Sequence, residues 1–259
     1  MYPYKIIWDI DLYDIFLTVG FISALIVFDI YTTKRKMKSK IQTFYLILGI
    51  VSIFVGLYSA ELFQSVFNYI KTGEFKFQGL TFYGGLIGGT IIFLTGFFLV
   101  GKFIFKDKEH ISSFKELLEV APCCITVAHA FGRLGCLTAG CCYGLETDGF
   151  PGFHMHVQTN SGYVEGTFLP TQLYESLFLF GLFVFLSVRY FKGKPRNLSV
   201  YLIAYGLWRF FMEFLRIDER GAFLPFLTPA QAISILAVIL GIILIFIFSK
   251  SEKNSKKAP

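Results

Sequence analysis

The chain has 259 residues, of which 54% are hydrophobic and only 16% are charged, and its formal net charge is +6. This composition excludes an average soluble domain and indicates a polytopic membrane protein. The positive charge does not indicate nucleic-acid binding, because most of the basic residues lie in short loops between apolar runs, where they orient a protein in its membrane.

Seven apolar runs are each close to the roughly 20 residues that cross a hydrocarbon core. The first, at about 10–31, carries Asp11, Asp14 and Asp29 instead of a basic leader and a small-residue cleavage site, so we expect a retained span rather than a signal peptide. The sequence therefore predicts an all-α fold class with seven transmembrane helices. The other six spans are expected at about 41–60, 83–105, 117–137, 173–191, 198–215 and 230–248.

Lysine and arginine concentrate in the first, third and fifth loops and in the tail. Because these residues mark the cytoplasmic side, the N-terminus is predicted outside and the C-terminus inside. We expect residues 1–249 to form one seven-helix domain and residues 250–259 to form a disordered basic cytoplasmic tail. The basic residues concerned are Lys34, Arg35, Lys36, Lys38, Lys40, Lys106, Lys108, Lys115, Arg189, Lys192, Lys194, Arg196, Lys250, Lys253, Lys256 and Lys257.

The loop at 138–172 differs from the others because it is long and contains no lysine or arginine. Loops of this length in compact proteins are often functional. We expect it to form a small cap on the outer side of the membrane, between the fourth and fifth helices.

Arg133 lies at the end of the fourth apolar run, in the stretch Gly132–Gly144, which contains four glycines. An arginine at membrane depth costs about 3 kcal/mol on insertion scales, and such residues face a partner or water. One hypothesis is that Arg133 holds an anion, most simply a lipid phosphate, with the glycines allowing close approach. The alternative is an arginine that extends from a helix end to the membrane interface.

Three charged residues share one face of the sixth apolar run. Arg209, Glu213 and Arg216 follow one another at spacings of four and three, which are helical neighbours. Arg209 and Glu213 can neutralise each other within the helix. Arg216 would then join Arg133 in gripping a phosphodiester by forked hydrogen bonds, a geometry that lysine does not offer.

A glycine-rich segment, 79–89, enters the third helix. Exposed amides at a helix N-terminus bind anions, but glycines in membrane helices more often allow close helix packing, and packing is the favoured interpretation. Tyr83 carries the reactive hydroxyl of this segment, yet with a pKa of about 10 it is a poor base unless a cation lowers that value. Further along, Gln172 and Glu175 either reach into a cavity or cap the fifth helix.

The cysteines have the residue types of a zinc or redox site, but the chain has no Cys-x-x-Cys pair and their spacing fits no common metal motif. Adjacent cysteines in an apolar setting are usually small buried hydrophobes. We therefore expect neither a metal nor another cofactor. The residues considered are Cys123, Cys124, His129, Cys136, Cys141 and Cys142.

Four motifs together resemble the prolipoprotein diacylglyceryl transferases, bacterial seven-helix enzymes that begin lipoprotein maturation. The likeness covers nearly the whole length, and the motifs occur in the family's order. They are Phe82–Gly88, Gly132–Gly135 with Gly144, Pro170–Glu175, and Tyr205–Arg209 with Glu213 and Arg216.

The resemblance implies an enzyme of the bacterial plasma membrane with two substrates. The diacylglyceryl group of phosphatidylglycerol would be transferred to the lipobox cysteine in a prolipoprotein signal peptide, with release of glycerol phosphate. It implies membrane lipid as a partner and no nucleic acid. It implies catalytic roles for Arg133, Arg209 and Glu213 and a place in the lipid cavity for Tyr13. With the other candidates, the predicted catalytic residues are Arg133, Arg209, Tyr83 and Glu213, and the predicted substrate-binding residues are Tyr13, Arg133, Gly84, Gly85, Gly144, Gln172 and Arg216.

Three departures from the family pattern leave thiol activation open. Tyr83 stands where the family has a histidine that is a favoured base, Cys136 and Cys141 replace an asparagine and an acid, and the arginine motif of the second helix is missing from 55–61. Tyr83 takes the histidine's role, or the substrate thiol needs little help, or the enzyme uses another acceptor. A lipid-binding protein without catalytic activity is a further alternative.

Overall fold

The structure is a computed structural model that describes residues 5–6, 10–75, 77, 79, 81–159, 162–217 and 227–255, without the side chains at positions 71, 82, 83 and 250–255. The chain divides into two compact units, which we describe separately. Unit 1 comprises Met1–Phe28 and Leu118–Pro259, and unit 2 comprises Asp29–Leu117. Of the predicted cytoplasmic tail, residues 256–259 lie outside the described residues.

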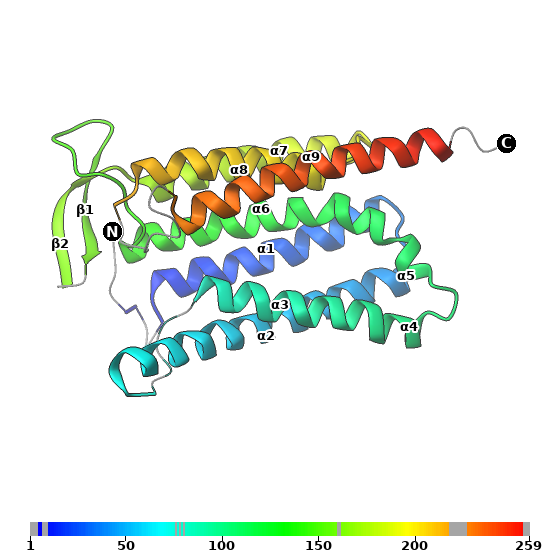
Figure 1. Ribbon diagram of the computed structural model, residues 1–259, viewed down its shortest axis with the longest axis horizontal. Coiled ribbons are helices and arrows are strands. Elements are labelled where there is room, and N and C mark those ends of the chain that lie inside the picture. The colour runs from blue at the N-terminus through cyan, green and yellow to red at the C-terminus, as the bar shows by residue number, and fades with distance from the viewer. Residues whose placement is uncertain are drawn as a thin grey trace. The chain divides into compact units, whose positions relative to one another are not determined.

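Seven helices in the described part of the chain are long and apolar enough to cross a membrane, which confirms the seven predicted spans. The third span continues through a π-helical turn, and the sixth ends in a short 3₁₀ turn, η2. Figure 1 labels the α-helices and the two strands. The helical elements are α1 (Leu12–Lys34), α2 (Ser39–Thr72), α3 (Phe82–Thr95), η1 (Gly96–Val100), α4 (Gly101–Ile104), α5 (Glu109–Ser112), α6 (Phe114–Ala139), α7 (Thr171–Phe191), α8 (Asn197–Met212), η2 (Glu213–Leu215) and α9 (Pro229–Ser255).

Helix α2 is longer than predicted, because apolar residues continue among the polar ones beyond Ala60, as far as Ile70. The helix ends at Thr72, and the next residue, Gly73, has a left-handed backbone (φ 75°) and donates its N–H to the carbonyl of Tyr69. Glycine is the usual residue at this position after a helix.

The core of unit 2 surrounds the buried ring of Phe97, on η1. The rings of Phe114 and His110 lie 5.0 and 5.2 Å from it, and the hydroxyl of Tyr45 donates a 2.7 Å hydrogen bond to the His110 carbonyl. Burial lowers the pKa of His110. These contacts connect α2, η1, α5 and α6.

Unit 1 joins α6 to α9 with the first part of α1. Close approach of α8 and α9 depends on Gly206, where a Cβ would lie 2.9 Å from the Ser234 carbonyl oxygen. Helix α6 also completes the start of α8, because the Glu119 carboxylate accepts hydrogen bonds from the backbone N–H groups of Arg196 and Asn197, at 2.6 and 2.8 Å. Those N–H groups have no partner inside α8 itself.

The predicted cap contains a β-hairpin that the sequence analysis did not anticipate. Strands β1 (Phe153–Thr159) and β2 (Gly162–Phe168) pair antiparallel. Met155, Val157 and Phe168 form its small core, with Tyr143 packed against them. The alternation of buried and outward residues in β1 is the pattern of a strand with one covered face.

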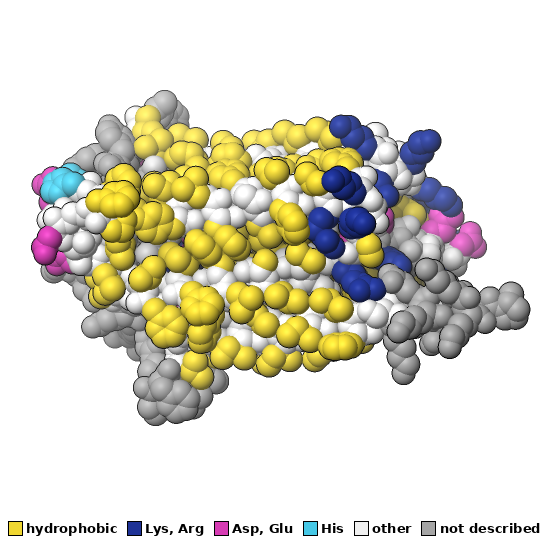
Figure 2. Space-filling view, turned by 90° about the horizontal axis from the view of Figure 1, so that it is seen from above, with side chains coloured by type: hydrophobic (Ala, Val, Ile, Leu, Met, Phe, Trp, Pro, Cys, Tyr) yellow, Lys and Arg dark blue, Asp and Glu magenta, His cyan; other side chains and the backbone are white. Residues whose placement is uncertain are grey.

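The surface of the spans is apolar. Figure 2 shows apolar side chains along the helices on one face, with lysine and arginine side chains gathered at one end. Such a surface suits contact with lipid tails. Exposed apolar side chains of α7 and α8 include Leu177, Val184, Phe185, Leu207 and Phe211.

Candidate active site

Arg133, near the end of α6, meets a buried carboxylate from α7. Its Nε lies 2.9 Å from Oε2 of Glu175, and the two side chains are 13% and 1% exposed. The N–H is not aligned with that oxygen as a hydrogen bond, so the contact is one of charge. A buried ion pair rarely adds net stability, because desolvation offsets the attraction. Inside a membrane span, such a pair points to function.

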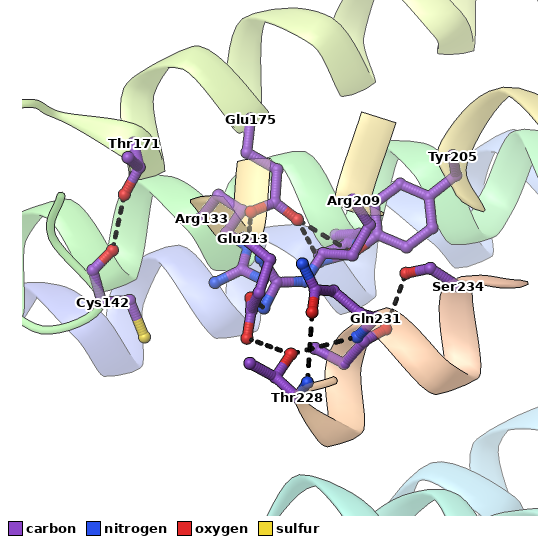
Figure 3. A network of polar contacts seen from close by, with 12 residues as sticks. Arg133, Cys142, Thr171, Glu175, Tyr205, Arg209, Glu213, Thr228, Gln231 and Ser234 are labelled. Atoms are coloured by element: carbon purple, nitrogen blue, oxygen red, sulfur yellow. Dashed lines mark hydrogen bonds and ion pairs between the residues drawn. The ribbon is translucent and has the colours of Figure 1, made fainter. Parts of the chain in front are cut away.

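Glu175 is the point where three helices converge (Figure 3). Its Oε1 accepts a 2.9 Å hydrogen bond from the hydroxyl of Tyr205, on α8. The Nε2 of His129, on α6, lies 3.8 Å from the same oxygen. The rings of His129 and Tyr205 meet edge to face, with centroids 5.1 Å apart. One carboxylate therefore fixes Arg133, His129 and Tyr205 together.

A second buried ion pair joins Arg209, on α8, to Glu213, on η2. Nη2 lies 2.7 Å from Oε2, and the side chains are 8% and 5% exposed. Their spacing predicted this pairing. Nη1 of Arg209 is also buried, and it has no hydrogen-bond partner among the described residues. A buried donor of this kind is available to an acceptor from a ligand.

The start of α9 holds Glu213 in place. The hydroxyl of Thr228 donates a 2.9 Å hydrogen bond to Oε1 of Glu213. The N–H of Thr228 donates to Oε1 of Gln231, and the N–H of Gln231 donates back to the Thr228 hydroxyl, at 3.1 and 3.2 Å. This reciprocal pair is a capping box, and Pro229 follows at the first helical position.

Arg216 leaves η2 in an extended conformation and forms an antiparallel bridge with Gly144. A Cβ on Gly144 would lie 2.6 Å from the Leu215 carbonyl oxygen and 2.7 Å from Cγ2 of Thr171. Only glycine fits there. Gly144 therefore brings the end of the Gly132–Gly144 stretch against the segment that carries Arg216.

The charges of Arg133 and Arg216 both act on Arg209. Like charges repel, and a bound anion would relieve that repulsion. Their planar N–H groups match the oxygens of a phosphate. The arrangement is chemically suited to bind a phosphodiester and to stabilise further negative charge on it.

The turn after α6 is held by the first residues of α7. Thr171 donates a 2.7 Å hydrogen bond from Oγ1 to the Cys142 carbonyl, and Gln172 donates a 2.6 Å bond from Nε2 to the Cys141 carbonyl. Gln172 is 1% exposed, and its Oε1 has no hydrogen-bond partner within the described chain. Gln172 thus positions this turn and keeps one acceptor available.

This turn also gathers three thiols. The sulfur atoms of Cys136, Cys141 and Cys142 lie within 4.8 Å of one another. Hydrogen bonds from the Cys136 and Cys141 thiols, together with the charges of Arg216 and Arg133, hold the pKa of Cys142 well below its usual range. The spacing in the sequence did not predict this cluster.

Tyr13, at the start of α1, packs on the same part of α6. A Cβ on Gly135 would lie 3.1 Å from Cδ2 of Tyr13, so the glycine makes room for the ring. The three clustered cysteines are among its electrostatic neighbours.

In unit 2, Gly84 and Gly85 pack α3 against α2. A Cβ on Gly84 would lie 2.6 Å from Cβ of Phe63, and one on Gly85 would lie 3.3 Å from Cβ of Ala60. The hydroxyl of Ser59 donates a 2.9 Å hydrogen bond to the Gly84 carbonyl. These contacts agree with the packing interpretation, while contact of the two glycines with substrate stays a prediction.

The predicted site residues are thus distributed over both units. Tyr83 lies in the first turn of α3, and because its side chain is outside the described part of the structure, its predicted role stays a prediction. Unit 2 also contains Gly84 and Gly85. Unit 1 contains Tyr13, Arg133, Gly144, Gln172, Arg209, Glu213 and Arg216.

A family model described as prolipoprotein diacylglyceryl transferase matches residues 4–247 of the chain. The chain belongs to this family. A phosphatidylglycerol–prolipoprotein diacylglyceryl transferase of Clostridium tetani is 32% identical over 244 residues, which are 92% of this chain and 91% of that protein. The corresponding protein of Clostridioides difficile is 31% identical over 218 residues, 80% of this chain and 79% of that protein.

A third relative, transferase 2 of Clostridium perfringens, is 36% identical over 169 residues, which are 64% of this chain and 61% of that protein. Membership of the prolipoprotein diacylglyceryl transferase family agrees with the resemblance of the four motifs and with the seven spans.

The sequence alone did not reveal the roles of several residues in the site. Glu175 was considered only as a cap or a cavity residue, although an acid within an apolar span is itself a signal. The Thr228, Pro229 and Gln231 pattern is a recognisable capping box. No local signal placed His129 beside Glu175, because their contact joins two helices.

Proposed function

We propose that this protein transfers the diacylglyceryl group of phosphatidylglycerol to the lipobox cysteine thiol of prolipoproteins and releases glycerol phosphate. One observation carries the proposal. In unit 1, Arg133 and Arg209 each pair with a buried carboxylate, and the charges of Arg133 and Arg216 act on Arg209. Nη1 of Arg209 has no acceptor among the described residues. The phosphate of the donor lipid is the anion that this arrangement suits.

The chemistry explains why arginines are needed. The acceptor sulfur attacks the glycerol carbon that carries the phosphate ester, an S–C bond forms, and the C–O bond breaks with its electron pair going to the phosphate oxygen. The leaving group therefore gains negative charge as the reaction proceeds. Donors fixed before the reaction, in a site with little water, stabilise that charge most strongly.

We assign Arg133 and Arg209 to the phosphate and Glu175 and Glu213 to positioning them. Arg216 adds a third guanidinium near the same anion. We assign the thiol proton to Tyr83 in its ionised form, because Tyr83 stands at the position of the family's histidine. The proposed substrate contacts are Tyr13, Gly84, Gly85, Gly144 and Gln172.

We place the enzyme in the bacterial plasma membrane, with the N-terminus and the β-hairpin cap outside and the C-terminus in the cytoplasm. The support is the excess of lysine and arginine in alternate loops. Fusions of alkaline phosphatase and a fluorescent protein to the C-terminus test this orientation. We expect fluorescence without phosphatase activity, and the reverse result would contradict the assignment.

The function is tested with purified protein in nanodiscs that contain phosphatidylglycerol, together with a lipobox peptide. We expect glycerol phosphate release and a gain in peptide mass equal to one diacylglyceryl group. Phosphatidylethanolamine as the only lipid, or a peptide with serine in place of the lipobox cysteine, should give neither product.

Two arginine variants make the assay specific for the site. Arg133→Ala should lower the rate about 100-fold or more, as the loss of a charge-stabilising donor does in other enzymes. Arg35→Ala is the matched control, because Arg35 pairs with Glu116 at 3.6 Å within unit 2, with both side chains about one third exposed. Lipid binding without product in the unaltered protein would refute the transferase.

A further inference from the structure

Three thiols meet where α6 ends, and the proposed transfer reaction gives them no role. The sulfur atoms of Cys136, Cys141 and Cys142 all lie within 4.8 Å of one another, and each residue is partly buried. A tetrahedral zinc ion with Zn–S bonds of about 2.3 Å holds its sulfur ligands roughly 3.8 Å apart. Small rotations about the side-chain bonds would therefore bring all three sulfurs to ligand distance.

The backbone is shaped to gather these thiols. Gly140 and Cys142 have φ values of 71° and 64°. A left-handed conformation is uncommon for a residue other than glycine, and here it turns the chain back so that the adjacent thiols of Cys141 and Cys142 both approach Cys136. The N–H of Cys141 donates a 3.2 Å hydrogen bond to the Cys136 carbonyl.

Contacts from outside the turn hold it in this shape. Thr171 and Gln172 donate to the carbonyls of Cys142 and Cys141, as Figure 3 shows for Thr171. On the other side, the N–H of Gln158, in β1, donates a 2.9 Å hydrogen bond to the Gly140 carbonyl. Metal sites depend on such surrounding contacts, which fix their ligands before the ion binds.

The charge around the cluster also suits a metal thiolate. Three thiolates and one divalent ion carry a net charge of −1. Arg216 and Arg133 both act electrostatically on Cys142. Arg133 also lies one helical turn before Cys136 on the same face of α6, so the cluster borders the phosphate site.

We propose that Cys136, Cys141 and Cys142 bind one Zn²⁺ ion and that its fourth coordination position takes the thiol of the acceptor cysteine. Three protein ligands with one open position is the arrangement of catalytic rather than structural zinc. This inference rests on the proposed function, and it assigns the thiol activation to the metal ion in place of Tyr83.

The acceptor thiol binds zinc as the thiolate, because a coordinating thiol loses its proton, which passes to water. The zinc-bound sulfur attacks the glycerol carbon, the S–C bond forms, and the C–O bond breaks with its electron pair going to the phosphate. The product is a neutral thioether, a weaker ligand than a thiolate, so it leaves the zinc ion and reopens the fourth position.

Metal content is the first test. The full chain is purified in detergent without added metal, and its zinc is measured by mass spectrometry. We expect equimolar zinc in the unaltered protein and at least about 10-fold less in Cys136→Ser and Cys142→Ser. Cys123→Ser and Cys124→Ser are matched controls, because these cysteines lie on α6 outside the cluster, and they should keep their zinc.

The open fourth coordination position is tested with Co²⁺ in place of Zn²⁺. Phosphatidylglycerol is left out, so the result does not depend on diacylglyceryl transfer. Co²⁺-loaded protein should show the visible absorption of a tetrahedral thiolate site. A lipobox peptide with cysteine should change that spectrum, and the same peptide with serine should not. This measurement uses the unaltered chain, so a variant that fails to fold does not affect it.

The two proposals fail in different ways. Zinc binding and a cysteine-dependent cobalt spectrum without any transfer would refute the transferase and leave the metal site standing. Undiminished transfer after zinc removal, or in Cys136→Ser, would refute the metal site and leave the transferase standing. Copper or iron in place of zinc, or a disulfide within the cluster in the purified protein, would also overturn the zinc proposal.

Discussion

The helix contacts of unit 1 and unit 2 are built in different ways. In unit 2, α2 and α3 approach through glycines such as Gly84 and Gly85, and the contacts are made by backbone and small side chains. In unit 1, α6 meets α7 through the ion pair of Arg133 with Glu175, and α8 meets α7 through the hydrogen bond that Tyr205 donates to Glu175. Glycine contacts cost little in a membrane, whereas buried charges cost several kcal/mol each.

The glycine contacts of α2 with α3 serve helix packing, whereas the buried charges of unit 1 belong to the candidate active site. A protein that needed only to hold its helices together could use glycine and serine throughout, as unit 2 does between α2 and α3. The buried charged side chains of the candidate site lie in unit 1, where they point toward one another. We therefore expect substitutions at packing contacts such as that of Gly88 to change stability, and substitutions at the buried charges of unit 1 to change both stability and transfer.

The largest effect is expected for Glu175→Gln. The amide still accepts a hydrogen bond from Tyr205, but the buried guanidinium of Arg133 loses its opposite charge. Removing one partner of a buried pair costs about 3–5 kcal/mol. The free energy of unfolding, measured by titration with SDS in mixed micelles, should fall by this amount, and transfer should be lost.

The matched control for Glu175→Gln is Glu116→Gln, in unit 2. Glu116 pairs with Arg35 where both side chains are about one third exposed. Exposed pairs contribute less than about 1 kcal/mol, so stability and transfer should hardly change. Equal losses for the two glutamates would remove the distinction between the units.

A smaller effect is expected for Gly88→Ala, on α3. A Cβ there would overlap Oγ of Ser59, the group that donates to the Gly84 carbonyl. Overpacking of this kind costs about 1–3 kcal/mol. The free energy of unfolding should fall, while the fraction that remains folded transfers diacylglyceryl groups at the normal rate.

Gly49→Ala is the control for this glycine, because the added Cβ would meet no atom within 4 Å. Alanine is the better helix former by about 1 kcal/mol, so the variant should be as stable as the unaltered protein or more stable. A loss of transfer per folded molecule in Gly88→Ala would mean that the α2 and α3 contact belongs to the site.

The smallest effect is expected for Thr228→Ala. It removes both the N-cap of α9 and the hydrogen bond to Glu213, and a lost cap costs about 1 kcal/mol. Transfer should fall modestly, because Glu213 still pairs with Arg209. Thr228→Ser should restore the unfolding free energy and the transfer rate, and failure of this rescue would argue against a role for the hydroxyl.

Features that depend on local sequence were predictable. Hydropathy located the seven spans, because a span must satisfy its own backbone and present apolar side chains to lipid. The pairing of Arg209 with Glu213 followed from their spacing on one helix. The need for a glycine at position 144 was visible as a motif, but its cause, contact with Leu215 and Thr171, was not.

Features that depend on contacts between distant segments were not predictable. Glu175 meets Arg133 across two helices and a long loop. The cysteine cluster forms because Cys142 adopts a left-handed backbone, and the spacing of the cysteines carries no sign of it. The β-hairpin was missed because only one face of β1 is covered and most of β2 is exposed.

The central claim is that fixed guanidinium groups bind the donor phosphate and stabilise it as it leaves. The most direct test is Arg209→Lys, which keeps the charge but loses the forked geometry and the buried Nη1 donor. Its initial rate of glycerol phosphate release is measured over a series of phosphatidylglycerol fractions in nanodiscs, beside Arg35→Lys. We predict a loss of about 100-fold for Arg209→Lys at saturating lipid and none for Arg35→Lys. An unchanged rate in Arg209→Lys would contradict the account.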